Sequence, residues 1–199
     1  SQNDDVLRLL LDANPSLALN RESTKFLGPL YKKKRFSTLQ LLLERNASVY
    51  GATVDNVSIL HRGVLDHRTH LVKLMIDAKA PLEFRTLSAA VQGRQLAVVK
   101  MLVEANADLR VRHRQGASLL LAALENKSTS IVNILLNADP SLVEECNSSG
   151  MTSLMFAVMK YSAPDDARMV RMLLKQAVVH CVAQREDNEP PAKRFKRKK

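Results

Sequence analysis

The chain has 199 residues and a formal net charge of +10 at pH 7, with 46% apolar residues, 4% aromatic residues and no Trp. This apolar content supports an aliphatic core and excludes a chain that is disordered throughout. No glycine-rich phosphate loop and no apolar run of membrane-spanning length is present, and Cys146 and Cys181 lack disulfide-framework spacing, which favours a reducing intracellular compartment.

One phrase recurs along the chain: three apolar residues, a polar residue, a small residue and then usually Asn or Asp. The copies lie at residues 9–14, 41–46, 74–79, 101–106, 134–139 and 172–177. Their starts are separated by 32, 33, 27, 33 and 38 residues. Each copy ends an amphipathic helical pattern, and the Asn or Asp suits a left-handed stop. A period near 33 predicts stacked helical repeats rather than one central core.

A second, shorter helix is expected upstream of most copies. Ser58, Ser118 and Thr152 can cap its start, because their hydroxyls can accept a hydrogen bond from the first helical turn. The four-residue segments that begin with Ser58, Ser118 and Thr152 resemble the Thr-Pro-Leu-His signature of the ankyrin repeat. Residues 25–28 and 85–88 keep part of this signature. The resemblance covers residues 4–182. It implies an all-α ankyrin-repeat solenoid over residues 1–183, with about five full repeats and an N-terminal half repeat.

Three departures from the period are expected to be visible in the structure. The first copy lacks a first helix, so Leu7 and Leu10 should be poorly covered, and either another protein or upstream residues would seal this end. The 27-residue step predicts that the finger between consecutive repeats is missing between Leu82 and Leu87. The 38-residue step predicts a longer exposed loop over 160–166, which is either a contact point or a tolerated insertion.

In ankyrin proteins the finger tips and first helices line the concave binding face, so the resemblance implies a protein partner there or at the open N-terminal end. The residues expected to bind it are Tyr50, Asp55 and Asn56 on one tip, and Arg110, Arg112, His113 and Arg114 on another. Tyr is a frequent interface anchor, and the basic tip suits acidic partners. Ordinary exposed polar tips are the alternative. The basic run 32–35 either binds an acidic partner, forms half of a bipartite signal or is a solvated turn.

The apolar period ends at Gln184, and residues 184–199 are expected to form a flexible linker, over 185–191, and a basic tail. Six of the last seven residues are basic, and removing their charges from the net +10 leaves +4 for the rest of the chain. Residues 191–199 resemble a monopartite nuclear localisation signal, which implies capture by an importin-α-type receptor. The implied contacts are Lys193, Arg194, Phe195, Lys196, Arg197 and Lys198. Lys193 would take the deepest pocket, although a register starting at Lys196 is an alternative.

Catalytic, cofactor and metal sites are not expected. His61, His67 and His70 lack further ligands nearby, and His61 matches a structural histidine of ankyrin repeats. His180 and Cys181 are adjacent in sequence, so they cannot face each other on a helix. We therefore expect a non-enzymatic adaptor or regulatory subunit, for instance of a protein kinase complex, in nucleus and cytoplasm. The alternatives are a transcription or chromatin regulator, direct nucleic-acid binding through the tail, or a merely solubilising tail.

Overall fold

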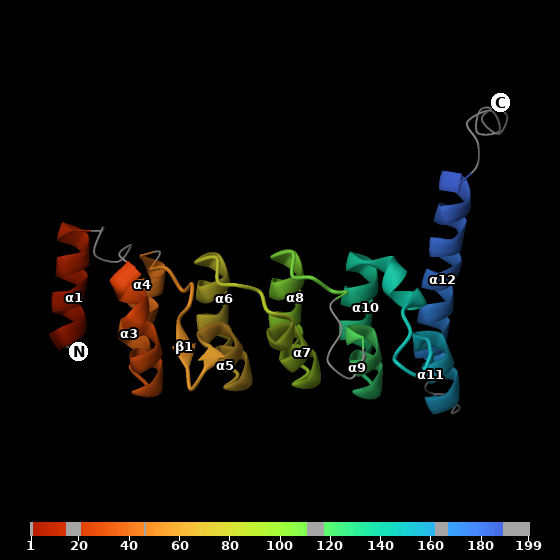
Figure 1. Ribbon diagram of the computed structural model, residues 1–199, viewed down its shortest axis with the longest axis horizontal. Helices are drawn as coiled ribbons and strands as arrows, with labels where there is room; N and C mark the ends of the chain where they lie inside the picture. Colours follow the sequence, from red (N-terminus) through yellow and green to blue (C-terminus); the bar gives the residue numbers. More distant parts are fainter. Residues whose placement is uncertain (1, 15–20, 46, 111–117, 162–166, 189–199) are drawn as a thin grey trace. The chain divides into compact units, whose positions relative to one another are not determined.

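The computed structural model describes residues 2–14, 21–45, 47–110, 118–161 and 167–188 (Figure 1). The chain divides into two compact units, which we call the N-terminal unit (residues 1–108) and the C-terminal unit (residues 109–199). Within the described residues no helix is both long and apolar enough to cross a membrane.

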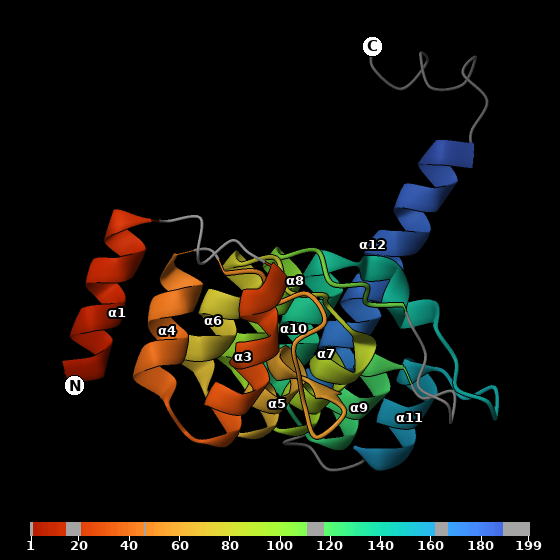
Figure 2. The same ribbon diagram turned by 60° about the vertical axis from the view of Figure 1, so that its left-hand side comes forward.

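Helical pairs build the N-terminal unit. Its elements are α1 (Gln2–Ala13), α3 (Arg21–Lys32), α4 (Phe36–Glu44), β1 (Thr53–Val54), β2 (Val57–Ser58), α5 (Ile59–Leu65), α6 (Thr69–Asp77), α7 (Phe84–Gln92) and α8 (Leu96–Glu104). Helices α3, α5 and α7 each pair with the next helix and contact one another in a row, and α4, α6 and α8 form a second row (Figures 1 and 2). Helix α1 packs against α4, as the outer helix of a half repeat would.

Packing between repeats supplies the core. Helices of seven to twelve residues are marginal on their own, so they depend on burying an apolar face. Val64, Val72 and Met75 are fully buried between neighbouring pairs, as are Val98 and Val99 in the next pair. At the N-terminal end Leu11 is buried but Leu10 is 53% exposed, which confirms the open face predicted for Leu10. The side chain of Leu7 lies outside the described residues.

The predicted helix starts are confirmed. The backbone N–H groups of His61, Leu121 and Met155 donate to the hydroxyl oxygens of Ser58 at 3.4 Å, Ser118 at 3.3 Å and Thr152 at 3.2 Å, respectively. These local bonds satisfy a backbone donor of the first turn, which explains why short sequence signals located them correctly.

The described turns inside the helical pairs have a feature that the sequence analysis missed. In the turns of α3–α4, α5–α6, α7–α8 and α9–α10 one residue adopts the left-handed conformation: Lys34 (φ 57°), His67 (φ 55°), Arg94 (φ 53°) and Lys127 (φ 52°). In the second pair, His67 N–H donates to Val64 O and Arg68 N–H donates to Gly63 O at 2.9 Å, which is a Schellman motif. Glycine is the usual residue at this position, yet here it is Lys, Arg or His.

The left-handed stop expected after the recurring phrase is confirmed at Asn106 (φ 60°) and Lys79 (φ 59°). It is wrong at Asp139, whose backbone is extended (φ −143°). Pro140 follows Asp139, and a proline restricts the preceding residue to extended conformations. The sixth copy does not end a helix, because residues 172–177 lie inside α12.

The missing finger is confirmed. Residues 78–83 join α6 to α7 without a strand, whereas the linker between α4 and α5 contains the β1–β2 hairpin. Asp55 (φ 50°) and Asn56 (φ 63°) form the hairpin turn, and two positive φ values in a two-residue loop are typical of a type I′ turn.

The C-terminal unit contains α9 (Leu119–Glu125), α10 (Thr129–Ala138), the 3₁₀ helix η1 (Pro140–Glu144), α11 (Ser153–Lys160) and α12 (Ala167–Asn188). Helix α9 packs against α10 and α11, and α12 packs against α10, α11 and η1. The start predicted for the linker at Gln184 is wrong, because α12 continues to Asn188 and the loss of an apolar period does not by itself end a helix. Residues 162–166 of the predicted longer loop lie outside the described residues.

The β1–β2 hairpin packs directly against α3 at Gly28. Strand β1 contacts α3, and a Cβ atom added at Gly28 would stand 2.2 Å from the carbonyl oxygen of Thr53. That oxygen belongs to the backbone, so it cannot move without shifting the hairpin. Gly28 is therefore the residue that lets the hairpin lie directly on the helix.

We predict that Gly28→Ala lowers the free energy of unfolding by about 1–3 kcal/mol, as overpacking does. Helix propensity alone would make the same substitution stabilising by roughly 1 kcal/mol. The sign of the change in unfolding free energy therefore reports the close contact with Thr53. Urea denaturation monitored by circular dichroism measures the change, with Phe26→Ala on the same helix as an exposed control. A stabilised Gly28→Ala variant would contradict this seating of the hairpin.

Candidate functional site

The predicted hairpin residues lie at two places on the N-terminal unit. Tyr50 precedes β1 at the base of the hairpin, and its side chain is 77% exposed. Asp55 and Asn56 form the exposed tip. The carboxylate of Asp55 pairs with Lys32 Nζ at 2.8 Å, and this hydrogen bond lowers the pKa of Asp55. Asp55 therefore joins the tip to the end of α3, while Tyr50 stays available for contact.

A cleft of about 350 Å³ lies between the hairpin tip and the turns of the first two helical pairs, and we call it the hairpin cleft. Side chains that line it include Lys32, Lys34, Arg62 and Arg68, together with Asp55 and Asp66. Four cations thus face two carboxylates. Tyr31, Phe36 and Val54 supply its apolar wall.

One polar network holds the floor of this cleft in place. The buried Tyr31 hydroxyl donates to Asp66 Oδ2 at 2.8 Å, and Arg62 Nε lies 3.3 Å from the same oxygen. Burial raises the pKa of Tyr31, and the bond to Asp66 raises it further. The phenol therefore stays protonated and remains a donor, which ties the first helical pair to the second.

An aromatic pair supports Arg68. The guanidinium carbon of Arg68 lies 4.3 Å from the centre of the Phe36 ring. The Tyr31 ring meets Phe36 edge-on, with centroids 5.4 Å apart and planes at 81°. Lys34 and Arg68 are exposed, and neither forms an ion pair within the described residues. The basic run 32–35 therefore contributes one paired cation, Lys32, and one unpaired cation, Lys34, to the cleft.

The missing finger leaves open space beside the hairpin. A cavity of about 210 Å³ is lined by Val49 and Gly51, which flank Tyr50, and by His61, Pro81 and Arg85. A second cavity of about 560 Å³ lies between the ends of α6 and α8. These spaces occur where residues 78–83 replace a full finger.

His61, for which the resemblance implied a structural role, is half-buried and lies near the backbone of Arg85 in the next repeat. Burial is the main cause that lowers the pKa of His61, so the neutral imidazole is favoured in the folded protein. Its buried Nδ1 has no hydrogen-bond partner in the structure.

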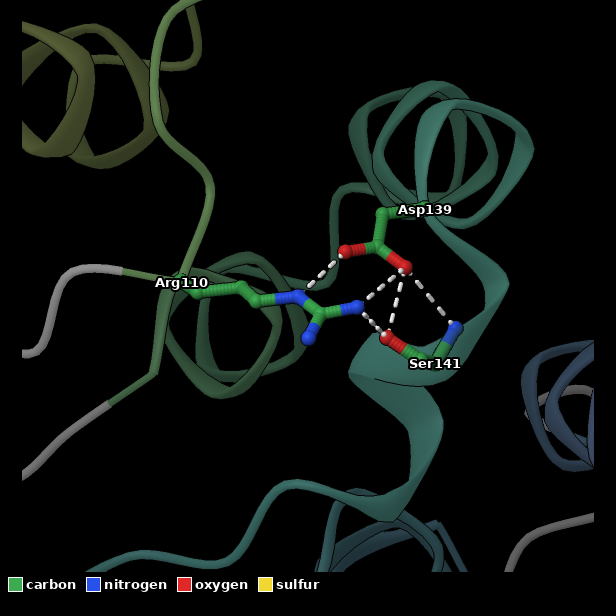
Figure 3. A network of polar contacts seen from close by, with 3 residues as sticks. All are labelled: Arg110, Asp139 and Ser141. Carbon is green, nitrogen blue, oxygen red and sulfur yellow. Dashed lines mark hydrogen bonds and ion pairs between the residues drawn. The ribbon is translucent and has the colours of Figure 1, made fainter.

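Arg110 from the second predicted tip is held by the C-terminal unit itself (Figure 3). Its Nε donates to Asp139 Oδ2 at 2.7 Å, and its Nη2 donates to the other carboxylate oxygen at 3.3 Å and to the Ser141 hydroxyl at 2.5 Å. Asp139 also accepts from the backbone N–H of Ser141 at 3.1 Å, so it caps η1. Arg110 thus braces the start of this unit.

Two groups of predicted residues lie outside the described residues. They are Arg112, His113 and Arg114 of the second tip, and Lys193 to Lys198 of the tail.

We predict that Asp139→Asn weakens the C-terminal unit by about 1 kcal/mol at neutral pH, since exposed bidentate pairs lie near the upper end of 0.2–1 kcal/mol. The Arg110 hydrogen bond lowers the pKa of Asp139, so its stabilisation is present above the unfolded pKa of about 3.9 and is lost as pH falls through the lower folded pKa. Melting temperatures between pH 7 and pH 2 should show a shallower acid limb for this variant. Glu125→Gln, an exposed carboxylate of the same unit, is the control, and equal acid limbs for Asp139→Asn and wild type would contradict the prediction.

Comparisons with known proteins agree with this architecture. Residues 86–184 match a family model described as ankyrin repeats, in three copies. The crystal structure of an ankyrin repeat domain from Acinetobacter baumannii AYE is similar, with a TM-score of 0.62 and 18% sequence identity over 73% of this chain and 78% of that chain. No curated protein matches the sequence. The chain therefore has an ankyrin-repeat fold, its residues 86–184 carry repeats that match the ankyrin family, and such repeats indicate a protein–protein interaction module.

Proposed function

We propose that this protein is a non-enzymatic adaptor or regulatory subunit, for instance of a protein kinase complex, and that its partner binds the hairpin side of the N-terminal unit. The observation that carries the proposal is the exposed Tyr50, whose neighbours Val49 and Gly51 line the cavity left by the missing finger. An exposed aromatic side chain beside an unfilled cavity is the arrangement of an interface anchor.

The stacked repeats suit this role for a physical reason. Repeats contact only their neighbours and leave an extended surface of finger and inner helices. A partner can therefore contact several repeats at once without any change in the buried core. Partner choice then depends on the tips and on the open space between them, which differ from repeat to repeat in this chain.

We further propose that the tail carries the protein into the nucleus, so that it is present in nucleus and cytoplasm. Lys193, Arg194 and Lys196 would bind an importin-α-type receptor. Such a receptor would hold an extended backbone and accept each basic side chain with aromatic walls around its stem and a carboxylate at its head. Support comes from the Lys-Arg-x-Lys sequence that follows Pro191 and Ala192.

We predict that Tyr50→Ala reduces partner capture at least about tenfold, because loss of an interface anchor costs about 1–2 kcal/mol or more. The tagged full chain is used to capture proteins from native cells, and the most enriched protein is quantified by mass spectrometry. Met159→Ala, an exposed side chain of the C-terminal unit, is the matched control. Undiminished capture by Tyr50→Ala, or an equal loss with Met159→Ala, would refute a Tyr50-centred interface.

We predict that the double variant Lys193→Ala and Arg194→Ala loses nuclear accumulation and binding to a purified importin-α-type receptor. The chain is only 22.2 kDa, so it is imaged as a fusion with a tag large enough to prevent passive diffusion. Lys73→Ala with Lys100→Ala removes the same charge from the N-terminal unit and serves as the control. Nuclear accumulation that persists without Lys193 and Arg194 would exclude this signal.

A further inference from the structure

We propose that the hairpin cleft docks an acidic segment of a protein partner, and that a partner Asp or Glu carboxylate pairs with Arg68 and Lys34. The inference rests on the proposed function and names the chemistry of the partner that this side of the N-terminal unit accepts.

The charge balance of the cleft is the first argument. Lys32 is paired with Asp55 at 2.8 Å, and Arg62 lies 3.3 Å from Asp66. Each carboxylate that lines the cleft is therefore used by a cation of the same chain. Lys34 and Arg68 remain as a positive pair with no carboxylate among the described residues to neutralise it. A carboxylate from a partner protein would neutralise this positive pair.

The geometry of Arg68 is the second argument. Its guanidinium lies 4.3 Å over the Phe36 ring, and Phe36 is held edge-on by the buried Tyr31. This cation–π contact leaves the guanidinium N–H groups without a carboxylate among the described residues. An arginine held in this way binds a carboxylate through two parallel bonds and loses little side-chain entropy in doing so.

Local folding energetics do not account for Arg68, which is the third argument. Arg68 is the N-cap of α6 but makes no side-chain cap bond, and a helix N-terminus disfavours a cation. A bound carboxylate at Arg68 would bring negative charge close to that N-terminus and relieve the unfavourable interaction.

The mixed charge of the cleft favours a protein segment over nucleic acid. Asp55 and Asp66 stand among the cations, and a continuous polyanion would be repelled by both. A peptide can present one or two carboxylates to Lys34 and Arg68 and place neutral or apolar side chains against Val54 and Phe36. A cleft of about 350 Å³ accommodates a few side chains of this kind.

The test uses the full chain with the six tail residues Lys193, Arg194, Lys196, Arg197, Lys198 and Lys199 replaced by Ala, so that the tail does not attract the probes. Fluorescence anisotropy measures binding of a labelled dodecapeptide of alternating Glu and Ser, of its Gln-Ser counterpart and of a 12-base-pair DNA duplex. We expect the Glu-Ser peptide to bind more tightly than the other two. Absence of Glu-Ser binding, or tighter binding of the duplex, overturns the proposal.

Variants then locate the binding. In this background, the double variant Lys34→Gln with Arg68→Gln should weaken binding of the Glu-Ser peptide about tenfold. The control double variant Lys73→Gln with Lys100→Gln removes the same charge from α6 and α8 and should leave the binding unchanged. Arg68→Lys keeps the charge but loses the guanidinium group that can form two parallel hydrogen bonds, so it should weaken binding measurably. Melting curves verify that each variant is folded. Equal losses in both double variants, or wild-type binding by Arg68→Lys, would overturn the assignment.

The outcome is separable from that of the proposed function. If Tyr50→Ala leaves partner capture intact but the cleft variant loses the Glu-Ser peptide, the Tyr50 interface fails and the acidic docking site stands. If Tyr50→Ala abolishes capture and the cleft variant binds the peptide normally, the interface stands and the acidic docking site fails.

Discussion

Burial of aliphatic side chains between neighbouring helical pairs is the interaction on which the rest of this structure depends. No pair in the described residues is long enough to enclose a core alone, and the fully buried Val72 and Met75 of α6 need α4 and α8 on either side. With few aromatic residues in the chain, this packing is almost entirely aliphatic. The stacked rows of helices follow from it, and they determine where every turn and finger of a unit can lie.

The linkers between helical pairs can vary in length while the helices keep their contacts with one another. Residues 78–83 omit a finger, yet α6 and α8 still pack together and α5 still packs on α7. The β1–β2 hairpin packs on α3 at Gly28. Changes in the linkers therefore alter the surface while the core is kept, which is how a repeat protein acquires a particular binding face.

Charged residues divide into those that brace the fold and those left for contact. Arg110 is held by Asp139 and Ser141, and Lys32 and Arg62 are held by carboxylates of the hairpin cleft. Arg68 is oriented by Phe36 rather than by a carboxylate. This orientation without neutralisation is the ground for the proposed carboxylate docking at Arg68, and a count of basic residues in the sequence does not reveal it.

The sequence by itself determined the repeat period, the capped helix starts at Ser58, Ser118 and Thr152, the missing finger and the exposure of Leu10, because apolar periodicity, caps and linker length are local signals. Only the tertiary structure decided that Arg68 stacks on Phe36, that the hairpin lies on Gly28 and that Arg110 reaches Asp139. Those contacts join residues 25 to 32 positions apart, so they depend on how one repeat packs against the next. The left-handed Lys34 and His67 also escaped the sequence, since glycine is the residue that normally signals such a turn.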